Sequence, residues 1–203
     1  VPRSAAPAAK AVQAPVPEVE SAIAAPGSAA PSAAAASSPV LAMKRAAAAL
    51  SSWQPARYRD LSLGSATVDD TLRRYGAPEV DTDTKSNEAL LPDGRRAHRL
   101  LDYGRKLDPR GRLRLYFDAG STALAWANLV LDPPLSLAAV QSAEGLVGEG
   151  VARAADAPPC DAQPTPPGDP AWPQIRSWPG QGVQLLLAGP DRVVEISYLE
   201  RCQ

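Results

Sequence analysis

The sequence predicts an α+β fold, in which short helices pack on an antiparallel sheet after a disordered N-terminal tether. Three observations predict it. Residues 1–52 are almost wholly Ala, Pro and Ser, so they carry too little apolar side-chain area to offset the entropy of ordering the backbone. Beyond residue 52, one short segment shows helical spacing of apolar residues, and several segments alternate between apolar and polar residues as half-buried strands do. Residues 53–203 therefore form the folded domain.

The best-marked helix is Val68–Tyr75. Thr67 and Asp70 have the spacing of a capping box, with Asp in place of the usual Glu. Apolar side chains recur at i, i+4 and i+7, which places them on one face. Gly76 and Pro78 then end the helix.

Two further segments favour helices. Leu41–Leu50 has high helix propensity, which predicts a short helix near the end of the tether. Ser136–Leu146 follows a pair of prolines and predicts a helix in the second part of the domain.

Strands are predicted where apolar and polar residues alternate. The segments are Arg99–Tyr103, Arg112–Phe117, Ala123–Val130, Val183–Leu187 and Val193–Leu199. Their short connections indicate an antiparallel meander. Leu124, Trp126 and Asn128 are expected on one face, with Trp126 inside the core. By contrast, Asp81–Arg96 is polar and is predicted to form turns.

The series of predicted helix and strands is repeated in the second half of the domain. A helix signal and then strand signals occur in residues 58–132, and a similar series occurs in residues 133–203. A degenerate internal duplication explains this correspondence. Chance similarity among short helix and hairpin signals is the alternative.

The segments Leu63–Pro78 and Leu113–Gly120 resemble the small outer-membrane lipoproteins of the SmpA/OmlA type. The shared features are a Gly before a short helix, a Gly-x-Pro exit and an apolar strand that ends in Phe-Asp before a turn. The tandem form of the architecture also looks like secreted β-lactamase inhibitor proteins. The resemblance implies an α+β fold at the cell envelope or outside the cell.

The two cysteines, Cys160 and Cys202, are isolated in the sequence and have no metal-ligand spacing. A disulfide between them is the leading interpretation, and two unrelated buried thiols are the alternative. A disulfide would place the protein in an oxidising compartment, so we expect a periplasmic or extracellular location.

Composition narrows the range of partners. The net charge is −1, and basic and acidic residues are interspersed, so no basic field is available for nucleic acid. No apolar run reaches the roughly 18 residues that cross a bilayer. We therefore expect no nucleic-acid partner, and membrane association only through an anchor upstream of Val1.

Catalytic and metal-binding signals are weak. The single histidine, His98, is interpreted as a surface residue at a strand edge. Asp69 and Asp70 suit a helix N-terminus. The acidic residues near Asp81 lack the Gly and the bidentate Glu of a calcium-binding loop. We expect neither a cofactor nor a metal site.

Glycine recurs at 145, 148 and 150, but this cluster does not follow a clear strand. It therefore fails the context test for a phosphate-binding loop.

The segment Cys160–Pro179 is rich in proline and is predicted to be an irregular, preorganised contact loop. Tryptophan is favoured at interface hot spots because it combines a large apolar area with a polar group. The alternative is that both tryptophans of this segment cover the sheet. The candidate contact residues are Trp172, Pro173, Ile175, Arg176 and Trp178.

These observations favour a non-catalytic protein-binding module or accessory subunit of a cell-envelope assembly, carried on a flexible tether. A secreted enzyme inhibitor is the first alternative. A cell-wall hydrolase with unrecognised carboxylates is the second.

The disulfide is directly testable. Mass mapping of unreduced protein, purified under oxidising conditions, should recover the peptides of Cys160 and Cys202 as one linked species. Two free thiols in such a preparation would contradict both the disulfide and the oxidising location.

Overall fold

Eight antiparallel strands form one sheet in the computed structural model, which describes residues 52–83, 89–155 and 172–202. Two short helices accompany the sheet, which confirms the α+β prediction. Residues 1–51 of the expected tether, including the helix predicted at Leu41–Leu50, lie outside the described residues.

The strand order is β3-β4-β5-β6-β10-β9-β8-β7. The first half contains β3 (Val80–Asp83), β4 (Ala97–Gly104), β5 (Gly111–Asp118) and β6 (Leu124–Leu135). The second half contains β7 (Val151–Ala154), β8 (Gln174–Trp178), β9 (Val183–Leu187) and β10 (Val193–Leu199).

Helix α2 (Val68–Tyr75) precedes the first half, and α3 (Leu137–Glu144) precedes the second. The described elements therefore run twice through one α-helix and four strands, which is the order that an internal duplication would give, and the duplication remains a prediction. The predicted boundary after residue 132 falls inside β6. The halves meet where their last strands, β6 and β10, pair antiparallel.

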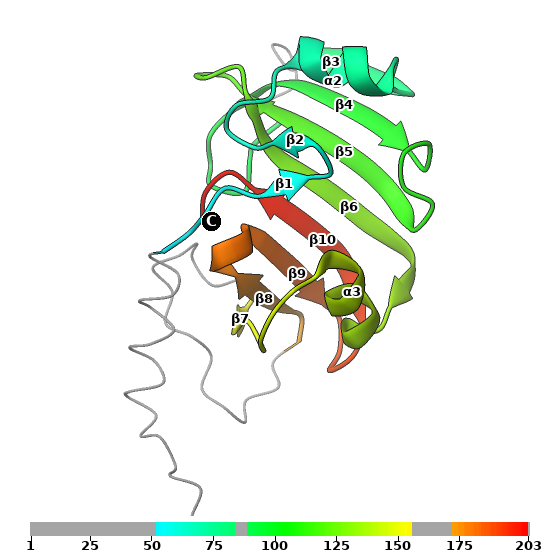
Figure 1. The fold of residues 1–203 in the computed structure, drawn as a ribbon, viewed down its shortest axis with the longest axis vertical. Helices are drawn as coiled ribbons and strands as arrows, with labels where there is room; N and C mark the ends of the chain where they lie inside the picture. Colours follow the sequence, from blue (N-terminus) through cyan, green and yellow to red (C-terminus); the bar gives the residue numbers. More distant parts are fainter. Residues whose placement is uncertain (1–51, 84–88, 156–171, 203) are drawn as a thin grey trace, which may run out of the picture. The chain divides into compact units, whose positions relative to one another are not determined.

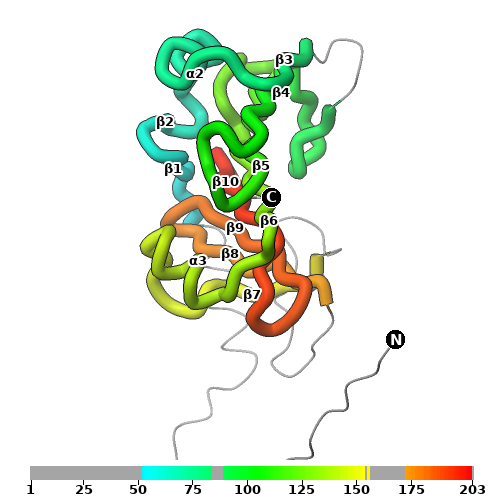
Figure 2. The backbone as a smooth tube through the Cα atoms, turned by 90° about the vertical axis from the view of Figure 1, so that its right-hand side faces the viewer, coloured from blue at the N-terminus to red at the C-terminus, as the bar shows by residue number. Residues whose placement is uncertain are grey.

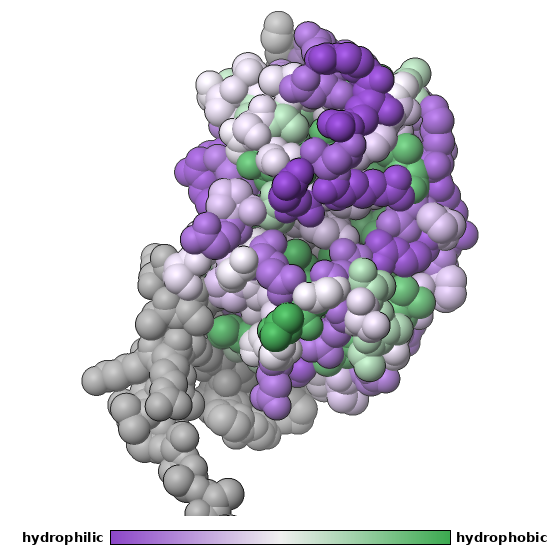
Figure 3. Space-filling model, viewed as in Figure 1, coloured by the Kyte–Doolittle hydropathy of each residue, from purple (hydrophilic) through white to green (hydrophobic). Residues whose placement is uncertain are grey.

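Both helices and the small hairpin of β1 (Arg57–Tyr58) and β2 (Leu61–Ser62) lie on one side of the sheet, as Figures 1 and 2 show from two directions. We call this side the first face and the opposite side the second face. The outer surface of the first-face layer is mostly polar over α2 (Figure 3).

Beneath this layer lies a hydrophobic core that both halves share. Its central members are fully buried leucine and isoleucine side chains. They extend from β4 to β9 and include Leu101, Leu115, Leu129, Ile196 and Leu185.

Helix α2 forms as predicted. Thr67 Oγ1 accepts from the Asp70 amide at 3.2 Å, and Asp70 Oδ2 accepts from the Thr67 amide at 3.1 Å. Gly76 ends the helix at a φ of 73°, a conformation that glycine adopts at little cost. The predicted apolar stripe of the helix packs against the core.

The prediction that Cys160–Pro179 is irregular is wrong at its C-terminal end. Gln174–Trp178 forms β8, and Pro179–Gln181 forms the 3-10 helix η1. The prolines flank the strand rather than interrupt it, and β9 supplies its hydrogen-bonding partner. The turn prediction for Asp81–Arg96 also missed β3, a short charged strand of the kind found at sheet edges.

The prediction that Leu124 and Trp126 share a face is wrong because of a β-bulge. Tyr116 lies opposite Trp126, but the next residue, Phe117, lies opposite Leu124. The extra residue in β6 reverses the alternation. Leu124 is fully buried in the core, whereas Trp126 and Asn128 lie on the second face.

The close pairing of β5 and β6 can be tested at Gly111. A Cβ atom there would lie 2.0 Å from the Val130 carbonyl oxygen, so main chain would have to move. We expect Gly111→Ala to lower the free energy of unfolding by about 3 kcal/mol. Gly180→Ala is the matched control, because no atom lies within 4 Å of its Cβ position, and it should change stability by less than about 0.5 kcal/mol. Equal denaturation midpoints for the two variants would contradict this packing.

Candidate interaction surface

The centre of the second face is a stacked aromatic pair. The rings of Tyr116 and Trp126, opposite one another on β5 and β6, have centroids 4.4 Å apart and planes within 18°. Trp126 remains partly exposed. Cross-strand aromatic pairs stabilise a sheet beyond their buried area, so this pair forms an ordered platform.

Hydrogen bonds fix the indole on this platform. Trp126 Nε1 donates to Ser197 Oγ at 3.0 Å, and Ser197 Oγ donates to Glu195 Oε1 at 3.1 Å. The Asn128 amide nitrogen also lies 3.4 Å from Ser197 Oγ. Strands β6 and β10 supply all four side chains, so the junction between the halves positions the platform.

Beyond the platform, the first half of this face carries arginines paired with carboxylates. Asp102 is 3% exposed and lies between Arg112 Nη2, at 2.7 Å, and Arg114 Nε, at 3.2 Å. Burial by itself raises the pKa of Asp102, but hydrogen bonds from Arg112, Gly104 and Arg114 hold it below its usual range. Glu79, Arg105 and Asp132 line one pocket with Arg112, so three carboxylates balance the three arginines of this region.

On the second half of the face, partly exposed apolar residues lie beside buried polar ones, among them Arg153 opposite Ile175. Ile175 and Leu186 lie opposite one another and are partly exposed. Ser177 and Gln184 also lie opposite one another, with exposed fractions of 0% and 6%. Ser177 Oγ and Gln184 Nε2 have no hydrogen-bond partner within the described residues.

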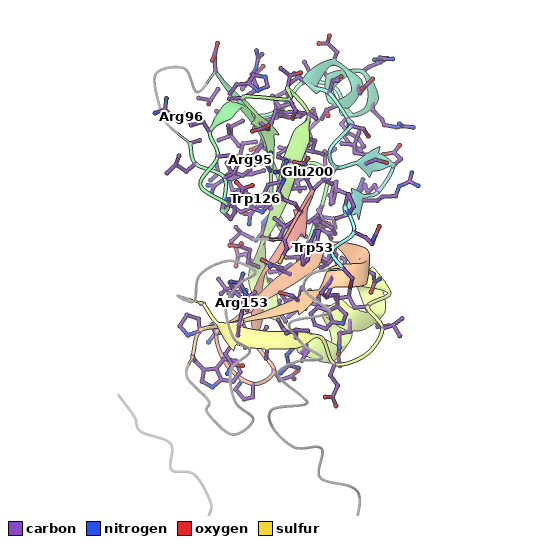
Figure 4. The ribbon with its side chains drawn as sticks, turned by 90° about the vertical axis from the view of Figure 1, so that its left-hand side faces the viewer. Trp53, Arg95, Arg96, Trp126, Arg153 and Glu200 are labelled. Carbon is purple, nitrogen blue, oxygen red and sulfur yellow. The ribbon has the colours of Figure 1, made fainter. Side chains whose placement is uncertain are left out.

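One end of the second face is closed by residues 89–96, which precede β4. Leu91, in the turn of this segment, packs against Tyr116 in a small second cluster. Arg95 holds this turn through Asp93 at 2.5 Å, Glu200 at 3.0 Å and Asp118 at 3.2 Å. Figure 4 shows Arg95 and Glu200 together beside Trp126, with Arg153 farther along the sheet.

The predicted contact residues do not form one surface. Trp178 is 4% exposed and belongs to the core, and Trp172 packs against that core. Pro173 is exposed, Ile175 lies on the second face, and Arg176 lies opposite Leu185 and so belongs to the first face. Residues 156–171 of the predicted loop lie outside the described residues.

The other sequence candidates have structural roles in the described chain. His98 Nδ1 lies 3.0 Å from the Asp118 carbonyl oxygen. Asp69 and Asp70 occupy the first turn of α2. Among the described residues, no group of three His, Cys, Asp or Glu side chains is arranged to hold a metal ion. Cys160 lies outside the described residues, so the disulfide remains a prediction.

No family model, curated protein or solved structure matches this chain. The resemblance to SmpA/OmlA-type lipoproteins and to tandem inhibitors therefore stays a prediction.

Sequence reasoning missed the second-face platform, although a signal for it was present. In β5 the residues between the core positions are Arg114 and Tyr116, which must lie on the opposite face. A large aromatic residue at such a position indicates a second packed or binding surface.

The anchor of residues 89–96 predicts a specific acid sensitivity. Burial raises the pKa of Asp118, but hydrogen bonds from Ser121 and the charge of Arg95 outweigh it and leave the pKa lowered from 3.8. The contribution of Asp118 to stability is therefore present above about pH 4 and lost as the pH falls through the folded-state pKa. We expect Asp118→Asn to cost about 2 kcal/mol at pH 7 and progressively less below pH 4.

Denaturant titrations between pH 7 and pH 2.5 measure this effect. Asp69→Asn, in the exposed first turn of α2, is the control and should follow the wild-type curve within about 0.5 kcal/mol. A constant difference between wild type and Asp118→Asn at every pH would contradict the assignment.

Proposed function

We propose that this protein is a non-catalytic protein-binding module, and that the second face of its sheet is the binding surface. The observation that carries the proposal is the Tyr116–Trp126 platform: both helices and the β1–β2 hairpin pack on the first face, while the indole of the platform stays partly exposed on the second face. Aromatic residues and arginines are enriched at the centres of protein interfaces.

Partly exposed apolar side chains support the same surface. Ile175 and Leu186 lie opposite one another on β8 and β9, on the same face as the platform, and would offer apolar contact area to a partner. Arg112 and Arg114 lie on the first half of this face, and arginine is enriched at protein interfaces.

The cellular setting is proposed as a cell-envelope assembly, periplasmic or extracellular, in which the Ala- and Pro-rich segment carries the domain. Such a composition suits an extended spacer. Within the described residues, no helix is long and apolar enough to cross a membrane.

A secreted enzyme inhibitor is the second candidate. The observation that favours it is the repeated order of one helix and four strands, which the resemblance to tandem inhibitors leads one to expect. The size of the complex separates the two functions, because an inhibitor forms a one-to-one complex and an accessory subunit a large assembly.

A cell-wall hydrolase is less well supported. Its general acid would need a carboxyl group with a raised pKa. The buried carboxylates Asp102 and Asp108 instead have pKa values below the usual range, because hydrogen bonds from arginines outweigh the opposing effect of burial.

Site-specific photo-crosslinking tests the proposed surface. A benzophenone amino acid at Glu195 or Leu186, both partly exposed on the second face, should give a discrete adduct with the same protein in the cells that produce this chain. The control is Arg73 on α2, whose side chain is 74% exposed, and it should give none of that adduct. Adducts from Arg73 alone would place binding elsewhere, and no adduct from any position would contradict the protein-binding function.

A further inference from the structure

The connection between α3 and β7, residues 145–150, presents an exposed apolar side chain. We call this connection the glycine loop. Leu146 is 8% exposed and packs in the core, whereas the next residue, Val147, is 84% exposed. Figure 3 shows small, separate hydrophobic spots on the half of the domain that carries α3. Single exposed apolar residues are common, so the exposure of Val147 alone does not indicate a binding site. The hydrogen bonds that order the main chain around it are the further observation.

Side-chain hydrogen bonds hold the main chain on both sides of Val147. Gln181 Oε1 accepts from the Val147 amide at 3.3 Å, and Gln181 Nε2 donates to the Gly145 carbonyl at 3.0 Å. The Gly148 carbonyl accepts from Gln141 Nε2 at 3.1 Å and from Trp178 Nε1 at 3.3 Å. Four hydrogen bonds therefore order the tip of an exposed loop.

The backbone conformation of the glycine loop requires glycine at three positions. Gly145, Gly148 and Gly150 all have positive φ values, between 62° and 84°, which other residues adopt only with strain. At Gly150, a Cβ atom would lie 2.9 Å from two carbons of the Trp178 ring. The loop rests directly on that buried indole, so Trp178 is a positioning residue rather than a contact.

The loop is not arranged to bind an anion. Phosphate-binding loops offer free main-chain N–H groups, but the Val147 amide donates to Gln181. The adjacent Glu149 is an exposed carboxylate, which repels a phosphate. Beside the tip, an open groove of about 520 Å³ is lined by Val147, Trp178, Pro179 and Val151, among others.

From these observations we infer that the glycine loop inserts Val147 into an apolar pocket of the partner protein, where a basic group beside the pocket meets Glu149. The inference rests on the proposed protein-binding function and adds a second contact to it. Burying one valine side chain strengthens binding by about ten- to a hundredfold. An ordered loop loses little conformational entropy when it docks, so most of that gain would appear as affinity.

Photo-crosslinking at Val147 is the first experiment. A benzophenone at this position should capture the same protein as the second-face positions Glu195 and Leu186. Adducts from the second face without one from Val147 would overturn this inference and leave the proposed function standing. An adduct from Val147 alone would support the loop and overturn the second-face surface, and no adduct at all would overturn both.

Titration calorimetry with the captured, purified protein is the second experiment. Val147→Thr keeps the β-branched shape and adds a hydroxyl group, so it should weaken binding about tenfold if the pocket is apolar. Val147→Ile keeps an apolar side chain and should stay within about threefold of wild type. Unchanged affinity in Val147→Thr, with its thermal midpoint retained, would overturn the inference.

Loop order and loop charge can be tested separately. Gln181→Ala should speed hydrogen exchange at the Val147 amide and weaken binding severalfold while Val147 remains in place. Glu149→Lys should slow association and reverse the salt dependence of the association rate. If Gln181→Ala speeds exchange at the Val147 amide but binds with full affinity, loop order does not contribute to binding. If Glu149→Lys associates at the wild-type rate, the partner has no basic group at this position.

Discussion

The antiparallel pairing of β6 with β10 is the contact on which the rest of the molecule depends. Strand β6 has twelve residues and pairs with β5 on one side and β10 on the other. Its register places Leu129 opposite Ile196, so side chains from both halves enter one core. The same register brings Trp126 within reach of Ser197 on the other side of the sheet. One set of main-chain hydrogen bonds therefore positions both the core and the proposed binding platform.

A buried polar network connects this junction to the glycine loop. Tyr198 on β10 donates to Glu144 at 2.7 Å, and Arg110 donates to the same carboxylate at 2.6 Å and forms an ion pair with Asp108 at 2.8 Å. Burial and the neighbouring Glu144 raise the pKa of Tyr198, so the phenol remains a neutral donor at physiological pH. Because Glu144 is the last residue of α3, this network fixes the point from which the glycine loop departs.

The sequence predicted correctly those helices and strands that have capping or turn residues at both ends. Helix α2 and strands β9 and β10 have the predicted limits, because capping residues, alternation and turn residues all agree. Strand β8 was missed because the prolines around it obscured a five-residue pattern whose partner comes from β9. The second-face platform was missed because a bulge of one residue, which depends on pairing between strands, decides where Trp126 lies. Trp178 was predicted to contact a partner because tryptophan is common at interfaces. The sequence does not show whether an indole is buried, and burial is what identifies Trp178 as a support beneath the glycine loop.

The junction also bears on how the molecule arose. If the first half existed alone, the long edge of β6 would be left open to water, and a second copy could pair with it by the same antiparallel contact. Such a pair would have twofold symmetry, with one helix and four strands contributed by each copy. The present chain carries the same order of elements within one polypeptide. Because the two halves are linked covalently, their sequences can differ, so that one half carries the Tyr116–Trp126 pair and the other the ordered loop that exposes Val147. Two identical copies could not divide these features between them.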